Sequence, residues 1–162
     1  DALPILFFTL GPYSPIVQLG GDMPEERFGY EANELTAWLD EIGETGRSLY
    51  QTFQLWDVAN AAITAIVLAT GLSFTLGRLF PADHYAHTFR QFPFIVFGLE
   101  LLENLLLYLN AINFPDQIAA GIVPITSMLK LVFGFGTIIF FVITLIWLLF
   151  TYFQTGSPKD TS

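Results

Sequence analysis

The sequence lacks cysteine and has few charged residues. Without cysteine the chain has no disulfide, no thiolate metal site and no cysteine nucleophile. Charged residues make up 13% of the 162 positions, whereas soluble domains usually carry about 25%. Hydrophobic residues make up 53%, and the mean hydropathy is +0.56. These values indicate an integral membrane protein, and the length suits a single domain.

Basic residues are scarcer than acidic ones. Six Lys and Arg stand against 15 Asp and Glu, which gives a formal net charge of −9. Most of the acids lie between Gln18 and Tyr50. An acidic segment repels phosphate groups, so the composition argues against nucleic acid and against tight docking on anionic lipid.

Four hydrophobic segments are expected to cross the membrane, at residues 1–17, 51–80, 93–113 and 118–153. The sequence therefore predicts an all-α, four-helix transmembrane bundle over residues 1–153, with a polar tail at 154–162. The first segment breaks at Gly11-Pro12 and is expected to be the outer end of a longer helix, with upstream residues missing or a leader removed. The last segment exceeds the ~30 Å hydrocarbon core, so we expect it to tilt, to bend near Pro124 or to begin with an interfacial turn.

Residues 18–50 form a polar outer insert. Apolar residues recur at helical spacing within 31–42, opposite an acidic face, and predict a short amphipathic helix on the membrane surface or against the bundle. Trp38 is expected at the membrane interface. Gly43 is expected to cap this helix, and Gly43 and Gly46 to bracket a turn.

Basic residues give the orientation. Arg78, Arg90 and Lys159 fall on the side opposite the insert if there are four spans. The positive-inside rule then predicts a bacterial inner-membrane protein with both termini cytoplasmic and residues 18–50 periplasmic.

Polar side chains interrupt the spans at Asp57, Glu100, Glu103, Asn104 and Lys130. Helical spacing puts Glu100, Glu103 and Asn104 on one face. Glu103 and Lys130 lie at similar depths on neighbouring antiparallel segments, which predicts an ion pair with Asn104 beside it and with Glu100 left unbalanced. Two interpretations remain open: a proton or cation site, and a hydrogen-bonded clamp that fixes helix register.

Small residues recur every four positions in the second span and form a ridge, which permits close approach by bundle helices or by another protein. The ridge residues after Asp57 are Ala61, Ala65, Ala69, Ser73 and Gly77.

Aromatic residues from Phe133 to Trp147, together with Gly134 and Gly136 in the same span, suit contact with lipid, pigment or another hydrophobic cofactor, or another subunit. Bound lipid is the expected cofactor-like ligand.

Catalytic and metal motifs give little support to an enzyme. His84 and His87 have a spacing seen in metal sites but lack a third strong ligand nearby. No serine-histidine pair, phosphate loop or H-E-x-x-H motif occurs. We therefore expect neither a resident metal nor catalytic activity.

Several stretches carry a resemblance: Phe28-Gly-Tyr30, residues 42–50, Asp57, the Glu100–Asn104 patch and Lys130. They resemble a loose group of small prokaryotic four-span membrane proteins whose function is unassigned. In that group the patch more often resembles Asp-Leu-Leu-Glu-Asn, so Glu100 is a conservative departure. The resemblance covers about residues 28–135 and implies that Asp57, Glu103, Asn104 and Lys130 belong together.

Two functions are compatible with these features. The first is an accessory or scaffold subunit of a larger membrane complex of respiratory or photosynthetic type, with other membrane subunits and the bilayer as partners. The second is a small transporter or proton-coupled membrane protein that uses Glu100, Glu103 and Lys130.

Overall fold

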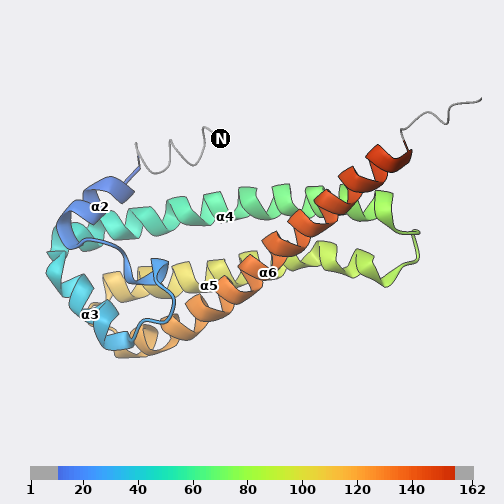
Figure 1. The fold of residues 1–162 in the computed structure, drawn as a ribbon. Helices are drawn as coiled ribbons and strands as arrows, with labels where there is room; N and C mark the ends of the chain where they lie inside the picture. The colour runs from blue at the N-terminus through green and yellow to red at the C-terminus, as the bar shows by residue number, and fades with distance from the viewer. Residues whose placement is uncertain (1–10, 156–162) are drawn as a thin grey trace, which may run out of the picture.

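The computed structural model describes residues 11–155, and every regular element within that range is a helix (Figure 1). The all-α prediction is therefore confirmed for this part of the chain. In chain order the elements are α2 (Tyr13–Gly20), the 3-10 helix η1 (Pro24–Glu26), α3 (Ala32–Glu41), α4 (Gly43–Leu79), the 3-10 helix η2 (Tyr85–Gln91), α5 (Phe92–Ile112) and α6 (Gln117–Thr155).

Three helices are long and apolar enough to cross a membrane, namely Gly43–Leu79, Tyr85–Ile112 and Gln117–Gln154. They fit an integral membrane protein. Most of the predicted first span, residues 1–10, lies outside the described residues, and the remainder enters α2, a helix of eight residues. The count of four spans therefore stays a prediction. Residues 156–162 of the predicted tail also lie outside the described range.

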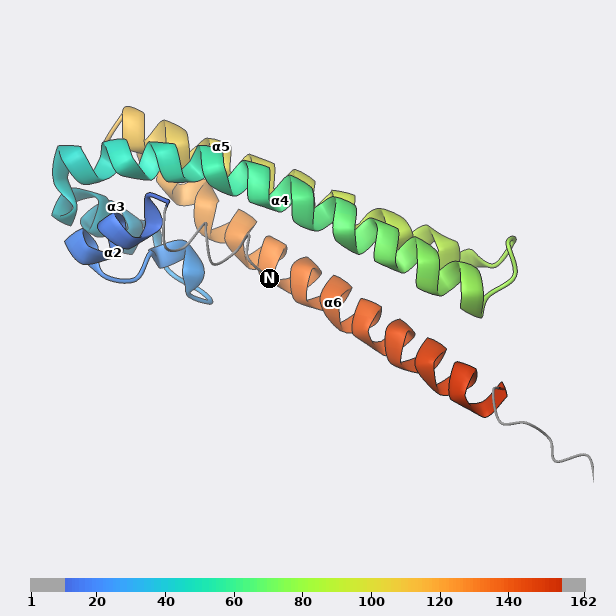
Figure 2. The ribbon, with the colours of Figure 1, turned by 90° about the horizontal axis from the view of Figure 1, so that it is seen from above.

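The helices α4 and α5 run side by side in opposite directions and are joined through η2, while α6 crosses this pair obliquely (Figures 1 and 2). Near its start α6 packs on α5. Further along it reaches α4, where the Thr144 hydroxyl lies 3.2 Å from the Thr75 hydroxyl. The ring centroids of Trp147 and Phe80 lie 5.5 Å apart. The helix continues through Pro124 without interruption. Because a tilted helix needs more residues to cover the same thickness, the oblique course of α6 allows it to be longer than α5.

The insert packs on one end of the bundle, where α2, η1 and α3 meet α4, α5 and α6 (Figure 2). The apolar core that joins them includes Ile16, Met23, Tyr30, Leu35, Leu39, Tyr50, Leu107 and Val123. Trp38 packs within the protein and is only 6% exposed, and its place at the membrane interface stays a prediction. Its indole N–H donates to the Gly20 carbonyl at 2.9 Å, and its ring meets Tyr50 edge-on at 5.1 Å. The insert is thus held to the bundle by burial of large side chains.

The helix that contains the predicted span 51–80 begins before residue 51, since α4 starts at Gly43. Gly43 has a φ of +65°, a conformation that glycine adopts without steric cost, and it redirects the chain between α3 and α4. Gly46 lies inside α4 rather than in a turn. A Cβ atom there would come within 2.5 Å of the Ile42 side chain, so Gly46 leaves room for that side chain at the junction of α3 and α4.

Candidate functional site: a buried acidic cluster under the insert

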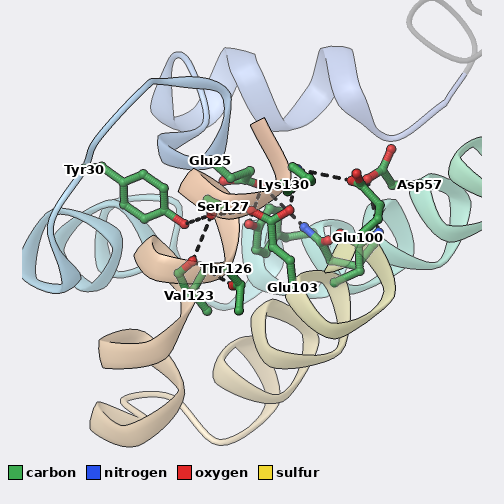
Figure 3. Close-up of polar contacts among 12 residues, drawn as sticks. Glu25, Tyr30, Asp57, Glu100, Glu103, Val123, Thr126, Ser127 and Lys130 are labelled. Atoms are coloured by element: carbon green, nitrogen blue, oxygen red, sulfur yellow. Dashed lines mark hydrogen bonds and ion pairs between the residues drawn. The ribbon is translucent and has the colours of Figure 1, made fainter. Parts of the chain in front are cut away.

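Lys130 of α6 lies at the centre of a group of buried polar side chains (Figure 3). Its ammonium group forms ion pairs with the carboxylate of Glu103 and, at 3.2 Å, with Oε1 of Glu100. Glu103 is fully buried, whereas the Glu100 side chain is 16% exposed. The predicted contact of Glu103 with Lys130 is present. Glu100, predicted to be left unbalanced, shares the Lys130 ammonium with Glu103, because one helical turn brings both carboxylates within reach of the same flexible side chain. One ammonium group thus faces two carboxyl groups.

Asn104 has a different partner from the one predicted. Its amide donates to Oδ2 of Asp57 at 3.1 Å, which links α5 to α4. Asp57 therefore joins the cluster through Asn104. The five predicted polar residues thus lie together, contributed by three helices.

Ser127 and Tyr30 extend the cluster toward the insert (Figure 3). The Ser127 hydroxyl donates to Oε1 of Glu103 and lies 2.8 Å from the Tyr30 hydroxyl. Since Ser127 has one hydroxyl hydrogen, Tyr30 donates to Ser127 when Ser127 donates to Glu103. Sequence reasoning missed both residues. For Ser127 a signal existed, because it precedes Lys130 by three positions and so shares its helix face.

Glu25 of η1 is the third residue that sequence reasoning missed, and it is only 8% exposed. The Tyr50 hydroxyl donates to Oε1 of Glu25, and the Gln54 amide donates to the same oxygen at 3.4 Å. Burial raises the pKa of Glu25 to about 7, an effect that the Tyr50 hydrogen bond opposes. No sequence signal marks Glu25 as buried, because it lies in an acidic segment that looks fully solvated.

Two acceptor atoms near η1 have no donor among the described residues. They are Oε2 of Glu25 and Oε1 of Gln54, and both side chains are more than nine-tenths buried. Buried polar atoms are normally hydrogen-bonded, since an unpaired one costs about 1–3 kcal/mol.

Two cavities meet at the cluster. The first, of about 340 Å³, lies beneath η1 and is lined by Glu25, Glu26, Phe53, Gln54, Asp57, Asn60, Glu100, Asn104, Lys130 and Leu131. The second, of about 170 Å³, lies between α4, α5 and α6 and extends toward η2 as far as Leu68 and Pro93. Asp57, Asn60 and Glu100 line both. Glu103 lines neither, so the acids fall into two groups: one buried against Lys130 and Ser127, the others facing cavities.

The predicted small-residue ridge of α4 divides along its length. Ala65 and Ala69 are buried, and Ala61 lines the second cavity, whereas Ser73 and Gly77 are exposed. A four-residue spacing does not match the 3.6 residues of a helical turn, so the ridge is expected to rotate around the helix axis from a buried face to an exposed one. The close contact with α6 is made by Gly71, where a Cβ atom would lie 2.7 Å from the Phe141 ring.

The two histidines lie at the other end of the bundle and do not face one another as ligands. Nδ1 of His84 accepts the Ala86 amide hydrogen at 3.1 Å, and its ring stacks on Phe80 and Tyr85. Nε2 of His87 lies 2.9 Å from the Pro81 carbonyl. Within residues 11–155, no three His, Asp or Glu side chains are arranged to hold a metal ion.

The cluster can therefore exchange protons, since it gathers carboxyl groups around one ammonium group and two of them, those of Asp57 and Glu100, line cavities. No protein-family model matches the chain, and comparisons with curated proteins and with solved structures give no match either.

Proposed function

We propose that this protein is a small proton- or cation-coupled membrane protein whose working groups are Asp57 and Glu100. The observation that carries the proposal is the pair of cavities that share Asp57, Asn60 and Glu100. Carboxylates between helices are costly at membrane depth and commonly mark ion or proton pathways. Here they stand where a cavity under the insert meets a cavity that extends toward the opposite end of the bundle.

Glu103 and Lys130 have a supporting role in this proposal. Glu103 is fully buried, receives the Ser127 hydroxyl and pairs with Lys130. Such a carboxylate is fixed by its partners and has no path to water. Glu100 shares the same ammonium group but also faces both cavities, so a proton or cation that arrives through either cavity competes with Lys130 for it.

The orientation that we propose follows from charge. Arg78 is in the last turn of α4 and Arg90 is in η2. The segment from the end of α4 to the start of α5 lies at the end of the bundle opposite the insert (Figure 1), and the positive-inside rule assigns that end to the cytoplasm. The insert then faces the periplasm of a bacterial inner membrane. Both termini are cytoplasmic if residues 1–17 include a fourth span.

Proton flux tests this proposal. The full chain in proteoliposomes should dissipate an imposed pH gradient faster than empty liposomes, as followed with an enclosed pH-sensitive dye. Glu100→Gln should return the rate to that of empty liposomes, because it removes the titrating group at the meeting point of the cavities. Glu44→Gln, which changes an exposed acid in the first turn of α4, should keep the parent rate. A parent rate of proton flux equal to that of empty liposomes, together with equal rates of sodium and potassium flux followed with enclosed ion-sensitive dyes, would overturn the proposal.

An accessory subunit of a larger membrane complex is the second candidate. A groove of about 470 Å³ on the α4–α5 pair favours it, because the lining includes the ridge residues Ala69 and Ser73 together with Arg90 and Phe94. Small residues beside a groove allow another transmembrane helix to approach closely. The bilayer and other membrane subunits are the partners in this case.

Native electrophoresis in mild detergent separates the two candidates. A subunit should migrate with other proteins when extracted from its own membrane, and Ser73→Phe should release it by filling the groove. Thr88→Phe, at an exposed position of η2 outside that groove, is the matched control and should leave the assembly intact. Migration of the parent only as an 18.1 kDa species would contradict the subunit function.

A further inference from the structure

The groove on the outer surface of the α4–α5 pair has polar residues at one end and apolar residues at the other. The polar residues are Thr70, Ser73, Arg90 and Gln91. Arg90 and Gln91 directly precede α5, and Thr70 and Ser73 lie in the final three turns of α4. The apolar residues Ile66 and Phe94 lie about one turn further from that end of the two helices. A membrane lipid has the same order, with its headgroup toward the membrane surface and its acyl chains toward the middle of the bilayer.

The polar end of the groove gathers hydrogen-bond donors that are not used within the protein. The side chains of Thr70, Ser73, Arg90 and Gln91 are exposed, and none of them forms a hydrogen bond or ion pair with another described residue. The Arg90 guanidinium has five N–H donors in a plane that matches a phosphate group, and the Gln91 amide adds two more. An anion with several oxygen atoms can accept from these donors together, whereas an apolar transmembrane helix would leave the guanidinium unpaired.

Charge at this end of the bundle favours an anionic lipid. Between residues 61 and 99 the only acid is Asp83, against the two bases Arg78 and Arg90, and no carboxylate lines the groove. The acidic insert packs on the opposite end of the bundle (Figure 1). Its repulsion of anionic lipid is therefore remote from the groove, because charges separated by more than about 10 Å in water are largely screened.

We propose that an anionic phospholipid of the surrounding bilayer binds in this groove, with its phosphate on Arg90 and Gln91 and an acyl chain along Ile66 and Phe94. Basic pockets between transmembrane helices are typical sites for anionic headgroups. The volume of about 470 Å³ lies within the range of about 300–1,000 Å³ for ligand pockets. Lipid binding here is independent of the proposed ion coupling, because no residue lines both the groove and the cavities of the acidic cluster.

Native mass spectrometry of the full chain, delipidated in mild detergent, tests the lipid class. The probes are dioleoylphosphatidylglycerol, which is anionic, and dioleoylphosphatidylcholine, which has the same chains and a phosphate but no net charge. The anionic lipid should bind about fivefold or more tightly, because the choline group would place a second cation beside Arg90. Equal affinity for the two lipids, or no bound lipid, would overturn the inference without the use of any variant.

Two arginine variants locate the site. Arg90→Gln should weaken the binding of phosphatidylglycerol about fivefold and remove most of the preference over phosphatidylcholine. Arg78→Gln is the matched control, since it removes the same charge from the same end of the bundle. The Arg78 guanidinium lies over the Phe74 ring at 4.9 Å and does not line the groove, so this variant should bind like the parent. An equal loss in both variants would indicate attraction to the basic end as a whole and would overturn the assignment to the groove.

A partner helix is the competing occupant, and Ser73→Phe distinguishes it from a lipid. This variant fills the groove and should reduce the amount of bound phosphatidylglycerol. Release of a co-purified protein by Ser73→Phe, with the bound lipid unchanged, would assign the groove to a partner helix and overturn the inference.

Discussion

Replacing Lys130 with Met is expected to lower the free energy of unfolding by about 3–5 kcal/mol, since removal of one partner leaves a buried charge without compensation. Glu103 is fully buried and has only Ser127 as a further partner in the described structure. Glu100 loses its counter-charge at the same time. The measurement is unfolding of the detergent-solubilised protein by denaturant, followed by circular dichroism.

The double variant Lys130→Met with Glu103→Gln should recover a large part of this loss, because the glutamine carries no charge and can still accept from Ser127. Arg90→Met, an exposed basic position near the start of α5, is the matched control and should change stability by less than about 0.5 kcal/mol. If Lys130→Met is no more destabilising than Arg90→Met, the ion pair does not hold the helices together.

Glu25 should make the stability of the protein depend on pH. Burial raises its pKa from 4.5 to about 7, so between these values the folded protein holds a proton that the unfolded chain releases. Stability therefore falls as the pH rises from about 4.5 to about 7 and is constant with respect to this group above that range. The shift corresponds to a loss of about 3 kcal/mol.

Glu25→Gln should remove that part of the pH dependence, as measured by the unfolding free energy at pH 5 and pH 8. The neutral amide keeps the acceptor for Tyr50 and never ionises. Glu44→Gln, at an exposed acid, should leave the parent pH dependence unchanged. A Glu25→Gln protein that loses as much stability as the parent between the two pH values would show that Glu25 is not the group responsible.

Hydrophobic pattern was a sufficient guide to the long helices. The apolar runs placed α5 and α6 to within two residues at each end, because proline and polar residues border them in the sequence. The start of α4 lies before the apolar run for the opposite reason. Residues 43–50 contain polar side chains and two glycines, yet they are helical because Tyr50 and Gly46 pack against the insert. Tertiary contacts there override the local pattern.

Within the site, helical periodicity predicted the shared face of Glu100, Glu103 and Asn104. The similar depths of Glu103 and Lys130 on neighbouring helices predicted their contact. Both inferences need only helix geometry and a short connection between neighbouring helices. Lys130 pairs with two carboxylates, and Asn104 donates to Asp57 rather than to the ion pair. These contacts depend on how three helices are rotated about their axes. A single sequence does not specify those rotations.

The sequence by itself determined an all-helical chain with long apolar segments and a set of ionisable residues within them, because composition and periodicity report which side chains avoid water. Only the tertiary structure decided that Glu25 and Tyr30, from an acidic insert that looks solvated, are buried against the spans. It also decided that Asp57 and Glu100 line cavities, whereas Glu103 is fully buried. Both outcomes arise from segments far apart in the chain, whose packing no local pattern encodes.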